Sequence, residues 1–102
     1  MKIYKDYFVG DKAQKNKRKI IRNIKACKPQ RNVYVLTLPL NKANVMDIYP
    51  AYVLLQGYYK RQDIKVIGIA IGRDEAYTLA SQIIAKCYSE SGNVRVENLF
   101  NN

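Results

Sequence analysis

At 102 residues, with 48% hydrophobic residues, the chain is long enough for one small folded domain with a modest core. It contains no histidine, which excludes a Ser-His-Asp or Cys-His catalytic arrangement within it. Of its formal net charge of +10, nearly all lies in residues 1–31, which hold eleven lysines and arginines against two acids. We therefore distinguish a basic N-terminal arm and helix (1–31) from a core (32–102), and expect the N-terminal third to attract polyanions.

The sequence shows neither an apolar segment typical of a signal peptide nor one long enough to span a membrane. Its two cysteines, Cys27 and Cys87, do not fit the spacing of metal ligands. We therefore expect a cytoplasmic protein with reduced thiols, without a metal, a cofactor or a membrane partner.

The predicted elements begin with residues 1–10, which mix lysines with apolar and aromatic residues and suit a short strand or an extended arm. A helix is predicted over residues 12–27, with Asp11 as its N-cap and Pro29 after its end. Its apolar positions recur every three or four residues and form one narrow stripe: Ile20, Ile21, Ile24 and Cys27.

Residues 32–38 and 64–71 are almost continuously apolar, which predicts two strands buried on both faces. Between them, Asp47 as an N-cap and Pro50 in the first turn predict a second helix that ends near residues 60–62.

A third helix is predicted from Asp74 and Glu75, whose charges suit a helix N-terminus, to the stop at Gly92. Cys87 lies on its apolar stripe and is predicted to be an inert core residue. Residues 93–99 alternate between apolar and polar positions and predict a half-exposed edge strand.

These elements predict an α/β fold in the order α-β-α-β-α-β, with a small, mainly parallel sheet of three strands, or four if residues 2–9 add one. Two right-handed crossovers would place the second and third helices on one face of the sheet. The basic N-terminal helix would then cover the other face.

The basic helix is the first candidate site, because it carries no acid after Asp11. One interpretation is a ridge that binds phosphates; the alternative is a solvated helix that keeps a small protein soluble. The residues proposed to bind polyanions are Lys15, Arg18, Lys19, Arg22 and Lys25.

A secondary candidate combines aromatic and basic groups at the end of the second predicted helix: Tyr58, Tyr59, Lys60 and Arg61. Such clusters stack bases or bind phosphate, although packing of one tyrosine in the core and the other at its rim is the favoured explanation. Arg73, at the turn before the third helix, would assist anion binding there, but an ordinary strand-to-helix turn is favoured. No catalytic residues are assigned, since the Cys27 thiol has no partner base.

The sequence also resembles a family of small uncharacterised proteins from Gram-positive bacteria and their mobile elements. The resemblance is carried by YVLTL (34–38), DIY (47–49), LLQGYY (54–59) and GIAIGRDEA (68–76), and covers about residues 10–100. It implies no activity. A mobile-element setting favours nucleic acid or another protein as the partner.

The hypothesis is therefore a small, non-enzymatic protein that binds polyanions, above all nucleic-acid backbone, through its N-terminal helix. The alternative is an interaction module that docks an acidic protein or forms a homodimer through the edge strand predicted at residues 94–99.

Overall fold

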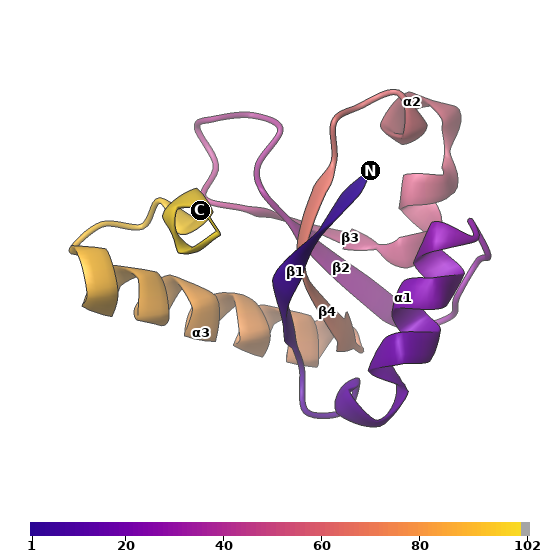
Figure 1. The fold of residues 1–102 in the computed structure, drawn as a ribbon, viewed down its shortest axis with the longest axis horizontal. Helices are drawn as coiled ribbons and strands as arrows, with labels where there is room; N and C mark the ends of the chain where they lie inside the picture. Colours follow the sequence, from indigo (N-terminus) through magenta and orange to yellow (C-terminus); the bar gives the residue numbers. More distant parts are fainter. Residues whose placement is uncertain (101–102) are drawn as a thin grey trace.

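Four strands form one mixed sheet in the computed structural model, which describes residues 1–100 (Figure 1). Across the sheet the order is β1 (Lys2–Val9), β4 (Lys65–Ile71), β2 (Val33–Thr37) and β3 (Asp47–Pro50). β1 pairs with β4 in parallel, whereas β4 with β2 and β2 with β3 are antiparallel. The α/β class is confirmed, but the prediction of a mainly parallel sheet in α-β-α-β-α-β order is wrong.

The second predicted helix accounts for most of this difference. Residues 47–50 are strand β3, paired with β2 so that Val35 lies opposite Tyr49. The Asp47 carboxylate caps no helix: it accepts hydrogen bonds from the Leu40 amide (3.0 Å) and the Tyr49 hydroxyl (3.1 Å). It thereby closes the loop between β2 and β3 into an antiparallel hairpin. Helical structure follows only as the short 3-10 helix η2 (Ala51–Leu55) and the single turn α2 (Gly57–Lys60).

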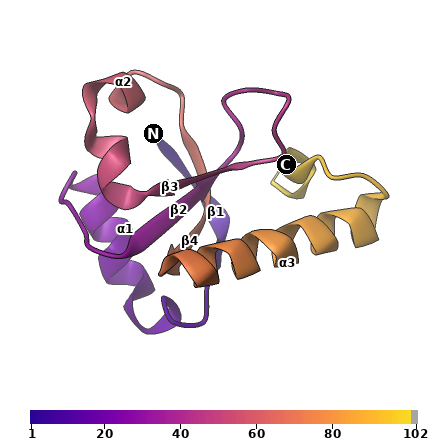
Figure 2. The ribbon, with the colours of Figure 1, turned by 180° about the vertical axis from the view of Figure 1, so that it is seen from behind.

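Two helical layers cover the two faces of the sheet (Figures 1 and 2). α1 (Lys17–Lys25), preceded by the 3-10 helix η1 (Gln14–Asn16), lies on one face together with η2. α3 (Arg73–Ser91) and the 3-10 helix η3 (Val96–Leu99) lie on the other. The basic helix therefore covers the face opposite the third helix, as predicted, but the second helical segment joins α1 rather than α3.

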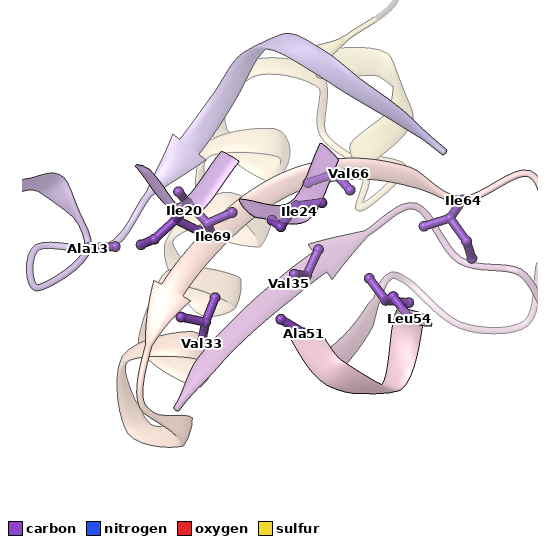
Figure 3. Packing of buried hydrophobic residues seen from close by; sticks show 10 residues of the cluster. All are labelled: Ala13, Ile20, Ile24, Val33, Val35, Ala51, Leu54, Ile64, Val66 and Ile69. Carbon is purple, nitrogen blue, oxygen red and sulfur yellow. The ribbon is translucent and has the colours of Figure 1, made fainter. Parts of the chain in front are cut away.

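Side chains from α1, η2, β2 and β4 meet in the core beneath α1 (Figure 3). Ile20 and Ile24 of α1 are 3% and 7% exposed, and they rest on the same face of the sheet as Val35 and Ile69. This burial fixes which side of α1 is turned away from the protein.

β1 is the fourth strand that the sequence left open, and it forms one edge of the sheet. Ile3 and Tyr7 face the α1 layer, whereas Tyr4 and Phe8 face α3 and contact the ring of Phe100, with ring centroids 5.1 and 5.8 Å away. Between Ile3 and Phe8 the pairing of β1 with β4 is irregular, and Lys5 and Asp6 within this stretch are exposed.

The C-terminal segment departs from the prediction after α3 ends, as expected, at Gly92, whose φ is 75°. No strand forms over residues 93–99 of the described chain. The Asn93 side chain accepts a hydrogen bond from the Arg95 amide (3.0 Å), and the backbone turns into η3. Val96, the first residue of η3, is fully buried, whereas Val94 before it is 41% exposed. The edge strand proposed for a homodimer is therefore absent.

Candidate polyanion-binding site

The basic helix is shorter than predicted and strongly two-sided. It begins at Lys17, after η1, so Asp11 is not its N-cap, and the Asn16 side chain makes no capping hydrogen bond. Ile20 and Ile24 hold it on the sheet. The side chains turned toward solvent include Arg18, Lys19, Arg22 and Lys25.

No carboxylate neutralises this row of cations within residues 1–100. The side-chain ion pairs found there are Lys65 with Asp63 and Lys86 with Glu90, both remote from α1 in the sequence. Neither acid of the N-terminal third, Asp6 or Asp11, forms an ion pair with these cations. Within residues 1–100, no ion pair therefore compensates the positive charge on the exposed face of α1.

A hollow of about 320 Å³ lies between β1 and α1, and we call it the arginine groove. Its lining combines one half-buried aromatic side chain from β1 with four residues of α1: Tyr7, Arg18, Ile21, Arg22 and Lys25. The three cations stand at i, i+4 and i+7 on the helix, so they follow one side of it.

A second hollow of about 400 Å³, the lysine pocket, adjoins the C-terminal end of α1. Lys25 lines it as well as the arginine groove, and Lys28 and Lys60 join it from other segments. Ile24 of α1 and Leu54 of η2, which lie on the same sheet face in Figure 3, belong to its apolar wall.

The loop after α1 positions Lys28 through a Schellman cap. The Lys28 amide donates to the Asn23 carbonyl (2.9 Å) and the Cys27 amide to the Ile24 carbonyl (3.1 Å). Cys27 occupies the left-handed position of this cap, with a φ of 56°, where glycine is usual. The stripe prediction for Cys27 is thus wrong, because the residue follows the helix end and is exposed; Cys87 is buried as predicted.

The structure gathers only part of the predicted primary set. Arg18, Arg22 and Lys25 line the arginine groove, whereas Lys15 of η1 and Lys19 of α1 are exposed and line neither hollow. Lys15 precedes α1, and Lys19 lies one position round the helix from Arg18.

The secondary set is dispersed. Lys60 enters the lysine pocket, but Arg61 lines neither hollow. Tyr59 packs against Tyr49, with ring centroids 5.2 Å apart, while Tyr58 is 57% exposed. This division between a packed and an exposed tyrosine is the one favoured from the sequence.

Arg73 also remains outside both hollows. It is exposed at the first residue of α3, the helix that covers the sheet face opposite α1. The neighbouring Glu75 carboxylate accepts the Lys12 amide (2.6 Å) and the Ile71 amide (2.9 Å). An acid thus binds the backbone donors beside this turn, as in the ordinary strand-to-helix turn favoured from the sequence.

Sequence reasoning missed Tyr7 as a site residue. Its place beside Arg18 depends on the pairing of β1 with β4 and on the packing of α1 across that face. No local pattern in residues 1–10 reveals either contact. Ile21 was predicted as a core residue, and it is half-buried with part of its surface in the groove.

No protein-family model, curated protein or solved structure matches the chain, so the resemblance to the Gram-positive family stays a prediction. Within residues 1–100, no group of three or more Cys, Asp or Glu side chains is arranged to hold a metal ion. None of the helices in that range combines the length and apolar character required to cross a membrane.

Proposed function

We propose that this protein binds nucleic acid through the backbone phosphates, with the arginine groove as its contact surface. The observation that carries the proposal is the composition of the groove: two arginines, one lysine and a tyrosine, with no carboxylate among the described lining residues. Guanidinium groups bind phosphate through paired hydrogen bonds, so two of them in one row suit a phosphate backbone.

The geometry of α1 supports contact with several phosphates at once. Arg18 and Lys25 are seven residues apart, which corresponds to about 10 Å along the helix axis. Double-stranded DNA carries one charge per ~1.7 Å of axis, so this length spans several phosphates. Because no side-chain pattern for reading base edges accompanies the row, binding should depend little on sequence.

Tyr7 adds a half-buried aromatic ring beside the cations. Bases stack on such rings in single-stranded nucleic acid, where their faces are accessible. The proposal therefore favours a single strand over a duplex. The role is one of binding rather than catalysis, and we place it in the cytoplasm, where nucleic acid is available and both thiols stay reduced.

The test is fluorescence-anisotropy binding to labelled single- and double-stranded oligonucleotides across a salt series. The groove variant carries Arg18→Gln, Arg22→Gln and Lys25→Gln. The control variant carries Arg73→Gln, Arg95→Gln and Lys42→Gln, which remove the same charge from exposed positions outside both hollows. The wild type should bind with a steep salt dependence. The groove variant should lose about 2–3 units of the slope of log K against log salt, and the control variant less than one.

Two results would contradict the proposal. Absence of binding at low salt by the folded wild type would assign the basic face to an acidic protein partner or to solubility alone. Equal losses in the groove and control variants would show that overall charge, not the groove, attracts the polyanion.

A further inference from the structure

The lysine pocket has a wall of aliphatic side chains drawn from three elements. Ile3 comes from β1, Ile24 from α1, and Ala51, Leu54 and Leu55 from η2. Its volume of about 400 Å³ lies in the ~300–1,000 Å³ range of small-molecule sites, which combine an apolar lining with a few polar groups. The pocket therefore has the size and lining of a ligand site rather than of a packing defect.

The polar groups of this pocket are almost all cationic. Lys25 ends α1, Lys28 follows its cap, and Lys60 ends α2, so three separate segments each supply an ammonium group. None of the three forms an ion pair within residues 1–100, and no carboxylate is among the described lining residues. Charge complementarity therefore requires an anion.

The pocket also differs from the arginine groove in lacking an aromatic side chain among its described lining residues. A nucleobase gains most of its contact energy by stacking on aromatic rings. An aliphatic wall instead favours a hydrocarbon chain, which it removes from water. The lining therefore favours a ligand with an apolar tail and an anionic head.

We propose that the lysine pocket binds a small, single-tailed amphipathic anion, with its hydrocarbon tail against the aliphatic wall and its carboxylate or phosphate head among Lys25, Lys28 and Lys60. This site goes beyond the proposed nucleic-acid contact. It shares only Lys25 with the arginine groove, so the two sites can be tested separately.

The first experiment is calorimetric titration of the protein with hexanoate, octanoate and decanoate below their micelle concentrations. Burial of each methylene group should tighten binding about fourfold. Octanol, without a charge, should bind more weakly than octanoate, and octylammonium most weakly of all. Equal affinity across the chain-length series, or octanol binding as tightly as octanoate, would overturn the proposal.

Cys27 provides an independent reporter of occupancy. Its exposed thiol lines the pocket, whereas Cys87 is fully buried, so a small neutral reagent such as iodoacetamide should modify only Cys27 in the folded protein. Saturating octanoate should slow this modification severalfold, and octylammonium should not. An unchanged rate at saturating octanoate would place the anion elsewhere and overturn the proposal.

Two variants separate this site from the arginine groove. Lys28→Gln with Lys60→Gln should weaken octanoate binding about three- to tenfold, as expected for the loss of two exposed ion pairs. Leu55→Trp should fill the pocket and weaken octanoate binding at least tenfold. If this variant fails to fold, the lysine variant remains the test. Both leave Arg18, Arg22 and Lys25 in place, so a failure of nucleic-acid binding does not affect this result. Unchanged octanoate affinity in the folded variants, or binding only to anionic vesicles and not to free octanoate, would overturn the proposal.

Discussion

At the scale of one residue, Cys27 has a backbone conformation that is unfavourable for a residue with a Cβ. Its φ of 56° lies in the left-handed region, which costs a residue with a Cβ about 1–2 kcal/mol relative to glycine. The Schellman hydrogen bonds around it nevertheless form, because the helix end is held by the packing of Ile24 beneath it. The protein therefore carries an exposed cysteine in the lining of the lysine pocket, in a backbone conformation that lowers its stability.

We expect Cys27→Gly to raise the free energy of unfolding by about 0.5–1 kcal/mol, after allowing for the greater freedom of glycine in the unfolded chain. Urea unfolding followed by circular dichroism measures the change. Cys27→Ala is the matched control, since it removes the thiol but keeps the Cβ, and it should bring no gain. Equal stability of the glycine and alanine variants would show that the left-handed cap stores no strain.

Tyr49 links one side chain to the pH dependence of the fold. Burial, with the Asp47 carboxylate beside it, raises the pKa of Tyr49 well above its ordinary value of about 10. The folded state therefore retains the hydroxyl proton that the unfolded state releases. The stability that this provides is present below about pH 10 and falls as the pH rises further.

Between pH 9.5 and 11, the unfolding free energy of the wild type should fall more steeply than that of Tyr49→Phe. At pH 8 the variant should be about 1 kcal/mol less stable, because it lacks the hydrogen bond to Asp47. Urea unfolding at a series of pH values measures both effects, and the other tyrosines cancel in the comparison. Parallel pH profiles would contradict the assignment of the raised pKa to Tyr49.

At the scale of the element, the first turn of α1 places positive charge at the positive end of the helix dipole. Lys17, Arg18 and Lys19 form its first turn, where the helix dipole is positive and acids are favoured. Its last turn carries Arg22 and Lys25, which suit the negative end. The cationic start is unfavourable for the helix, although Arg18 there is part of the proposed phosphate contact.

Lys19→Glu should therefore stabilise the protein by about 0.5–1 kcal/mol at low ionic strength, and less in high salt. Lys25→Glu makes the same change in net charge at the opposite end of α1, where it should destabilise. Thermal unfolding at two salt concentrations measures both. Stabilisation by both variants would mean that relief of overall charge repulsion outweighs the helix dipole.

The elements that could be predicted are those whose own sequence pattern is sufficient to define them. β2 and β4 are continuous apolar runs, and α3 has a long stripe and a glycine stop; all three lie within one or two residues of their predicted bounds. The structures of residues 47–50 and 94–99 could not be predicted. The first is a strand, and it depends on the Asp47 carboxylate accepting the Leu40 amide. The second is not a strand, because the Asn93 side chain accepts the Arg95 amide and turns the backbone. The antiparallel pairing of β2 with β3 depends on the hairpin that Asp47 closes, and it was missed as well.

The same distinction applies to the candidate site. The cationic face of α1 is a property of its own sequence and could be predicted. The arginine groove and the lysine pocket could not be predicted, since each combines α1 with other elements. The arginine groove adds β1, and the lysine pocket adds β1, η2 and α2. Lys28 and Lys60 meet only because the segments after α1 and η2 lie on one face of the sheet.

At the scale of the whole molecule, residues 1–31 build part of the core as well as carrying most of the charge. β1 forms a sheet edge against β4, and α1 covers one face of the sheet. We expect a fragment of residues 32–102 to lose cooperative unfolding and the dispersion of its amide NMR signals. Addition of a peptide of residues 1–31 should restore both. A folded fragment 32–102 would contradict this dependence.

The parallel pairing of β1 with β4 has a further consequence for aggregation. β4 reads KVIGIAI, an apolar segment without proline and with a single charge, of the kind that pairs with other chains when its edge is open. One of its edges is covered by β1, in which Lys2 lies opposite Lys65, more than sixty residues away in the sequence. Until that distant strand docks, every newly made molecule presents an open edge of its most apolar strand. The lysines and arginines that follow β1 should keep such molecules apart by mutual repulsion, so we expect the basic segment to limit aggregation during folding, whatever its binding role.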